Sequence, residues 1–247
     1  MLTLTSYIDE SRHEQSDDHM VVAGFCGSEN QWKSFLIEWQ RALDKKYALH
    51  MKDLRWSGEK GERRTKALLA RLGPVPYRHG LCPVYGAVKV SDYFDLIEGD
   101  PEFEQKICGY ILCLAVVLSV LVRDLPGHVK VKIICDKQYQ YEPLARELFK
   151  SFREMVAKSP KNAYFEDIDF ITRDSLALTQ PADYLAFALT KVLDEKGSKK
   201  ELWCRPIFNG KEPSKIPGRL YTRDKARRSI LEIKNGVKER RTWKFAF

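Results

Sequence analysis

Residues 103–195 alternate between segments of helical and strand periodicity, and this alternation limits the fold more than any other feature of the sequence. The pattern predicts an apolar helix from about Phe103 to Val122, a strand at 129–135, a helix from about Pro143 to Ala157, a strand at 166–171 and a helix that begins at 179–181. A strand, a helix and a second strand in succession are typical of parallel pairing. The sequence therefore predicts an α/β fold.

The first third of the chain has a different pattern. Two strands at 2–9 and 20–26 are separated by a polar segment, as in a hairpin, and a third strand is predicted at 82–88. The residues between the second and third strands, 28–80, read as a helical insertion. Since the periodicity weakens after Glu195, we expect one α/β domain over residues 1–195 and a C-terminal extension over 196–247.

The C-terminal extension holds the basic excess of the chain. It contains 16 Lys and Arg against 5 Asp and Glu, a balance of +11, whereas residues 1–195 contain 26 against 29, a balance of −3. A basic extension beside an acidic body is typical of a protein that holds a polyanion such as DNA or RNA. Arg227, Arg228, Arg240 and Arg241 are the candidate phosphate contacts, and solvated surface charge is the alternative interpretation.

Several function classes lose support because their motifs are missing. The chain has no P-loop, no Gly-rich dinucleotide fingerprint after a strand and no Ser elbow of the G-x-S-x-G type. Its six cysteines include no C-x-x-C pair, which favours reduced thiols and a cytoplasmic protein. The N-terminus has no signal-peptide pattern, and the apolar stretch 107–122 is shorter than the roughly 20 residues that a bilayer requires. We therefore expect no membrane association.

Three aspartates occupy positions that the predicted topology brings to one edge of the sheet. Asp9 ends the first strand, Asp136 follows the strand at 129–135, and Asp183 lies in the first turn of the helix after 179. If the two strands are parallel neighbours, all three side chains lie at their carboxyl edge. Carboxylates in close proximity repel each other unless a cation such as Mg²⁺ or Mn²⁺ lies between them. Such clusters are typical of phosphodiester hydrolysis, although a strand end, a loop start and a helix-dipole partner are the structural alternatives.

At these positions the chain resembles the bacterial and phage domain-of-unknown-function family 3800. The resemblance covers roughly residues 3–195 and rests on four segments: Tyr7-Ile8-Asp9-Glu10-Ser11, Leu49-His50-Met51-Lys52-Asp53-Leu54, the strand that ends in Asp136, and Gln180-Pro181-Ala182-Asp183-Tyr184-Leu185-Ala186. It implies a ribonuclease-H-like fold, with a mixed sheet and helices on both faces. By analogy with that fold, it implies a metal-dependent nuclease.

The resemblance also suggests further site residues. Ribonuclease-H-like nucleases take another acid from the helix after the third strand, where Glu104 is the candidate. Glu10 joins Asp9 in a site only if the chain turns there, because adjacent strand residues face opposite ways. His50 and Asp53 of the insertion could supply a proton donor or a ligand, and a structural histidine is the alternative.

The leading prediction is a divalent-metal-dependent nuclease that uses Mg²⁺ or Mn²⁺ and acts on DNA or RNA. Asp9, Asp136 and Asp183 would hold the metal, and Glu10 or Glu104 would complete the ligand set. Two alternatives remain at this stage: a noncatalytic nucleic-acid-binding or defence-associated interaction module with the same fold, and a metal-dependent enzyme that acts on a small phosphorylated molecule.

Overall fold

The protein is described from a computed structural model. The structure describes residues 2–11, 18–43, 49–98, 105–125, 128–136, 139–157, 164–172, 177–195 and 197–239, and their side chains except those of 105–108, 213 and 232–239. The predicted α/β class is confirmed.

A six-stranded mixed sheet, with the order β5-β4-β1-β2-β3-β6, forms the centre of the molecule. Its strands are β1 (Leu2–Ser11), β2 (His19–Ser28), β3 (Cys82–Lys89), β4 (Val129–Asp136), β5 (Tyr164–Ile171) and β6 (Gly218–Tyr221). β2 is antiparallel to both of its neighbours, β1 and β3, which confirms the predicted hairpin. The pairs β1 with β4, β4 with β5 and β3 with β6 are parallel. The carboxyl ends of β1 and β4 therefore lie at the same edge of the sheet.

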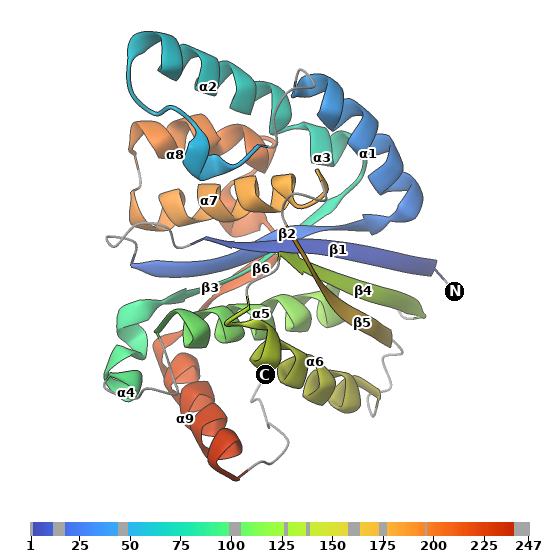
Figure 1. Cartoon of the computed structure of the whole chain (residues 1–247), viewed down its shortest axis with the longest axis vertical. Helices are drawn as coiled ribbons and strands as arrows, with labels where there is room; N and C mark the ends of the chain where they lie inside the picture. Colours follow the sequence, from blue (N-terminus) through green and yellow to red (C-terminus); the bar gives the residue numbers. More distant parts are fainter. Residues whose placement is uncertain are drawn as a thin grey trace.

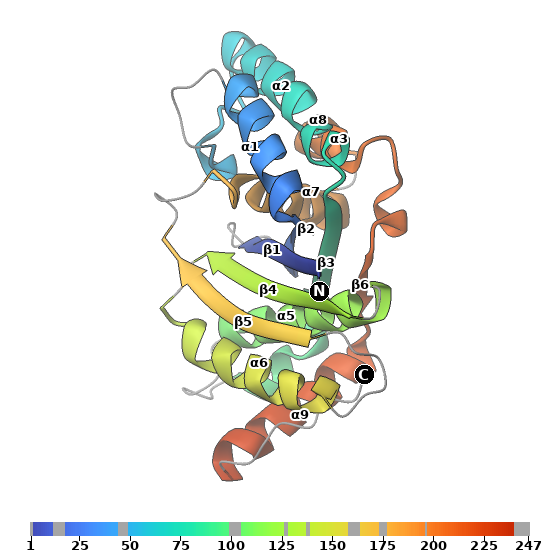
Figure 2. The same ribbon diagram turned by 90° about the vertical axis from the view of Figure 1, so that its right-hand side faces the viewer.

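Helices cover both faces of this sheet (Figures 1 and 2). One face carries α1 (Glu29–Ala42), η1 (Met51–Asp53), α2 (Glu59–Leu72), α3 (Val75–Arg78), α7 (Gln180–Asp194), α8 (Lys199–Cys204) and η4 (Arg205–Phe208). The other face carries η2 (Val90–Asp92), α4 (Phe94–Ile97), α5 (Gln105–Asp124), α6 (Glu142–Ala157) and α9 (Arg223–Glu239). The short helix η5 (Pro213–Lys215) precedes β6. As predicted, the residues between β2 and β3 are mainly helical.

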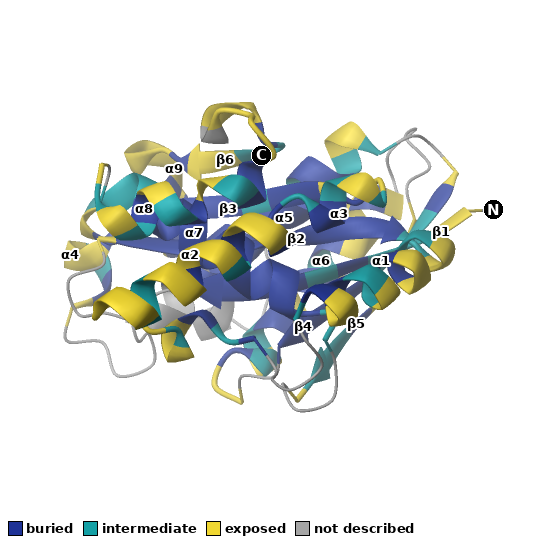
Figure 3. Ribbon diagram, turned by 90° about the horizontal axis from the view of Figure 1, so that it is seen from above, coloured by how far each residue is buried: buried dark blue, intermediate teal, exposed yellow. Residues whose placement is uncertain are grey.

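The sheet separates two hydrophobic cores, which we call the α5 core and the α7 core. In β4, Val131, Ile133 and Cys135 point into the α5 core, where α5 and α6 cover them. In β2, Val21, Ala23 and Phe25 point into the α7 core. This alternation follows from the two-residue period of a strand, so the face of any strand residue can be read from its neighbours. Figure 3 shows the buried sheet beneath the exposed outer surface of α2.

The helices begin where local chemistry favours them. Ser28 caps α1: its side chain accepts from the backbone N–H of Gln31, and the Gln31 side chain accepts from the Ser28 backbone, which forms a capping box. Pro181 lies in the first turn of α7, where its missing N–H removes no helical hydrogen bond. α5 is buried almost all around because it lies between the sheet, α6 and α9.

Residues after 195 add to the same sheet. β6 pairs in parallel with β3, and α9 buries Ala226 and Ile230 in the α5 core. The sequence pattern weakens here because β6 is short and only its pairing with β3 defines it as a strand. The predicted basic extension therefore shares one sheet and one core with residues 1–195.

Among the helices that the structure describes, none is long and apolar enough to cross a membrane. α5, the most apolar of the predicted helices, instead packs against β2 and β3.

Candidate acidic site at the carboxyl edge of the sheet

Asp9 and Asp136 lie on neighbouring parallel strands and face the same side. Ile8 of β1 pairs with Cys135 of β4, so each aspartate follows a member of this pair directly. Ile8 and Cys135 both point into the α5 core. Since adjacent strand residues point to opposite faces, Asp9 and Asp136 point to the α7 side. Both carboxylates are buried, with 4% and 2% exposure.

Asp183 reaches this side of the sheet from the first turn of α7, which packs across β1 and β2. Its Oδ2 accepts a hydrogen bond from the backbone N–H of Met51 at 2.9 Å and lies 2.8 Å from Nδ1 of His50. Its Oδ1 is buried and has no hydrogen-bond partner in the described part of the chain. A buried carboxylate oxygen without a donor is costly, which makes this atom a candidate ligand for a cation.

His50 lies at the start of η1 in the insertion, and its side chain is 15% exposed. The contact with Asp183 fixes one ring nitrogen and so orients the imidazole. Asp53, the other polar candidate of this segment, is exposed. The structure thus joins His50 to the aspartate of α7.

Glu10 points to the opposite side of the sheet from Asp9, as strand alternation requires. It is buried, and its backbone N–H donates to Oδ1 of Asp9 at 2.8 Å. Burial raises the pKa of the Tyr110 hydroxyl well above its usual value, and Cys135 and the Glu10 carboxylate raise it further. Burial likewise raises the pKa of the Cys135 thiol, and Glu10 adds to that rise. Glu10 therefore acts electrostatically on the α5 side of the strand end.

The remaining candidate residues are less closely connected with this edge. Glu104, Arg240 and Arg241 lie outside the described residues. Arg227 of α9 donates from Nη2 to Oδ2 of Asp95 in α4 at 2.7 Å. Arg228 is exposed on α9.

The donor chemistry of the site fits a hard divalent cation. Asp9, Asp136 and Asp183 offer carboxylate oxygens, which Mg²⁺ and Mn²⁺ prefer, and Oδ1 of Asp183 is unsatisfied. Within the residues that the structure describes, no three or more His, Cys, Asp or Glu side chains form a group that could hold a metal ion.

Two contacts that the sequence did not reveal fix the position of α7. Trp39 of α1 donates from Nε1 to Oε1 of Gln180 at 2.8 Å, in a buried bond at the start of α7. At the other end, Oδ1 of Asp194 lies 2.5 Å from Nδ1 of His19 in β2. The partners are 141 and 175 residues apart, and no sequence pattern connects them.

No model of a known protein family matches the chain, and no curated protein matches it. The resemblance to domain-of-unknown-function family 3800 stays a prediction. We therefore infer the function from the chain's own residues and their geometry.

Proposed function

We propose that this protein is a divalent-cation-dependent nuclease with a ribonuclease-H-like fold, which hydrolyses phosphodiester bonds of nucleic acid. The coarse architecture supports the fold assignment: the sheet is mixed, helices cover both faces, and the residues between β2 and β3 form a helical insertion. A shared fold does not imply a shared activity, so the proposal depends on the site.

The observation that carries the proposal is the placement of three buried aspartates on the α7 side of the sheet. Asp136 is the last residue of β4, and Asp9 lies two residues before the end of the adjacent parallel strand β1, on the same side. The first turn of α7 supplies Asp183, whose Oδ1 has no hydrogen-bond partner among the described residues. Carboxyl ends of parallel strands are where ligands bind in open α/β sheets. Buried carboxylates on one face favour a bound cation, because it relieves both their repulsion and their lost hydration.

In this proposal Asp9, Asp136 and Asp183 hold Mg²⁺ or Mn²⁺. Glu104 completes the set, because Glu10 points to the opposite side of the sheet from Asp9. When bound, such cations lower the pKa of water and stabilise the leaving oxygen of a phosphodiester. His50 positions Asp183 through the 2.8 Å contact, and its imidazole is a proton-transfer group in direct contact with that carboxylate. Arg227, Arg228, Arg240 and Arg241 hold the phosphate backbone.

A noncatalytic nucleic-acid-binding or defence-associated interaction module is the second candidate. Two observations favour it: Oδ2 of Asp183 already has two partners, and the described side chains include no group of three or more metal ligands. In this case the aspartates would position α7 and the basic residues would bind the partner.

The two candidates differ in what happens to substrate. We would incubate the full chain with single-stranded, duplex and DNA–RNA hybrid oligonucleotides in Mn²⁺, Mg²⁺ or EDTA, and compare Asp136→Asn with the matched control Asp169→Asn. Asp169 lies on the neighbouring strand β5, where it pairs with Lys132 at 2.6 Å. The nuclease proposal predicts metal-dependent cleavage that falls about a hundredfold or more in Asp136→Asn only. Metal-dependent cleavage that Asp136→Asn retains in full would rule out the site. Binding without cleavage, unaffected by EDTA, would establish the interaction module.

A further inference from the structure

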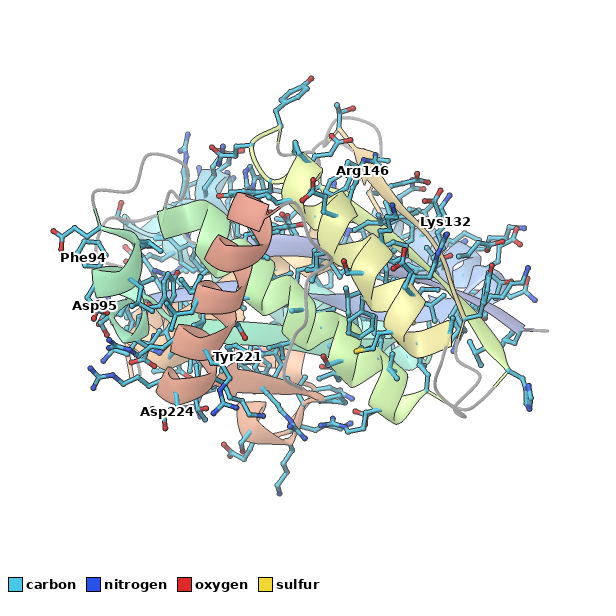
Figure 4. All side chains as sticks on the ribbon, turned by 90° about the horizontal axis from the view of Figure 1, so that it is seen from below. Phe94, Asp95, Lys132, Arg146, Tyr221 and Asp224 are labelled. Carbon is cyan, nitrogen blue, oxygen red and sulfur yellow. The ribbon has the colours of Figure 1, made fainter. Side chains whose placement is uncertain are left out.

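A second candidate site lies on the opposite side of the sheet from the aspartates. A cavity of about 290 Å³ opens between α5, β6 and the start of α9. Its walls include two apolar side chains of α5 and three cations: Val116, Val120, Arg123, Arg219 and Lys225. Figure 4 shows Tyr221 of β6, another wall residue, beside α9.

The three cations of this cavity differ in whether a carboxylate neutralises their charge. Arg123 donates from Nε and Nη2 to the carboxylate of Asp124 at 2.5 and 2.6 Å. Arg219 and Lys225 are exposed, and neither forms an ion pair with a described residue. Asp224, the acid next to Lys225, also forms no ion pair with a described residue. Two positive charges therefore border the cavity without a counter-charge from the described residues.

The floor of the cavity is apolar. Val116 and Val120 lie one turn apart on α5 and are both buried. The Tyr221 ring is held in place because its hydroxyl lies 2.8 Å from Oγ of Ser229 in α9. Ligand pockets commonly combine such an apolar surface with a few charged groups at fixed positions. The cavity thus suits a molecule with an anionic group and a less polar body.

We propose that this cavity binds a small phosphorylated molecule of about the size of a nucleoside monophosphate. A phosphate monoester carries roughly −1.5 to −2 charges near pH 7 and so matches the two unpaired cations, whereas a carboxylate would leave one of them uncompensated. The volume of about 290 Å³ lies at the lower end of the range of ligand pockets. The site is separate from the acidic edge, because α5 and α9 cover the opposite face of the sheet from α7.

Isothermal titration calorimetry of the full chain tests this proposal with AMP and UMP as probes. We expect saturable binding of the monophosphates and at least about tenfold weaker binding of adenosine and uridine. Arg219→Ala and Lys225→Ala should each weaken monophosphate binding about tenfold. Lys215→Ala removes the same charge from the exposed helix η5, outside the cavity walls, and should leave the affinity unchanged.

A second variant tests the cavity rather than its charge. Ser119 lines the wall, so Ser119→Phe fills the space and keeps every cation. It should abolish monophosphate binding, and thermal unfolding of each variant shows whether the fold is intact.

The proposal is overturned if the monophosphates do not bind, if the nucleosides bind equally well, or if the variants at Arg219 and Lys225 bind like wild type. It is also overturned if only oligonucleotides bind and lose affinity in these variants, which would assign the cations to nucleic-acid backbone. Asp136→Asn should retain monophosphate binding, so this result is independent of the nuclease proposal.

Discussion

Nδ1 of His50 lies 2.8 Å from Oδ2 of Asp183, although 133 residues separate them in the chain. The same carboxylate oxygen accepts the backbone N–H of Met51. One side chain at the start of α7 therefore fixes the helical insertion against the edge of the sheet. The other oxygen of Asp183 stays buried without a hydrogen-bond partner among the described residues.

Asp183→Ala should destabilise the protein by about 1–3 kcal/mol, because it leaves the Met51 N–H and the His50 ring without their acceptor. Asp183→Asn keeps an amide oxygen for Met51 and should cost less. Urea unfolding followed by circular dichroism gives both values. A gain in stability in either variant would show that repulsion among the carboxylates outweighs these hydrogen bonds.

Glu38 of α1 should make stability depend on pH. Burial raises the pKa of its carboxyl. Hydrogen bonds and charges from Arg78 and His79 lower this pKa by more than burial raises it, so the net shift is downward. Because the folded state then binds the proton less tightly than the unfolded state, Glu38 stabilises the fold above the ordinary Glu pKa of about 4.3. That contribution disappears as the pH falls through the lower folded pKa.

Glu38→Gln should therefore lower the free energy of unfolding at pH 6, by less than about 1 kcal/mol because the pair is partly exposed. The difference from wild type should shrink and then vanish as the pH falls through the lowered pKa of Glu38. Urea unfolding at several pH values measures it, and Glu147→Gln, an exposed change on α6, is the control. A difference that stays constant with pH would show that the Glu38 carboxyl does not cause this pH dependence.

Gly86 of β3 allows α5 to approach the sheet. A Cβ atom at this position would lie 2.2 Å from the backbone oxygen of Cys113 and 2.9 Å from Cβ of Val116. Gly86→Ala should therefore displace α5 and destabilise the fold by about 1–3 kcal/mol or more. An unchanged midpoint of urea unfolding would show that α5 and β3 are not in this close contact.

Arg227 and Arg228 should differ in nucleic-acid binding, despite being adjacent. Arg227 is paired with Asp95, whereas Arg228 is exposed and forms no ion pair with a described residue. If α9 contacts phosphates, Arg228→Ala should reduce the slope of log affinity against log salt by about 0.7–0.9, and Arg227→Ala should reduce it less. Fluorescence anisotropy with labelled oligonucleotides at several salt concentrations measures both slopes. Equal slopes in the two variants would contradict the prediction that Arg228 contacts phosphate more than Arg227 does.

Most elements between β1 and α7 could be predicted from residue patterns. The parallel pairing of β4 with β5 follows from the strand–helix–strand order, and the capping box at Ser28 marks the start of α1. β6 could not be predicted as part of the sheet, because four residues carry little periodic signal. Its strand conformation depends on backbone pairing with β3, more than a hundred residues earlier in the chain.

The sequence by itself determined the local elements and put Asp9, Asp136 and Asp183 at strand ends and a helix start, because periodicity and capping act over a few residues. Only the tertiary structure decided that Asp9 and Asp136 face α7, that His50 contacts Asp183, and that Arg219 and Lys225 border one cavity. These relationships depend on packing between segments far apart in the chain. Local preferences carry no information about such contacts, since many partners satisfy the same local pattern.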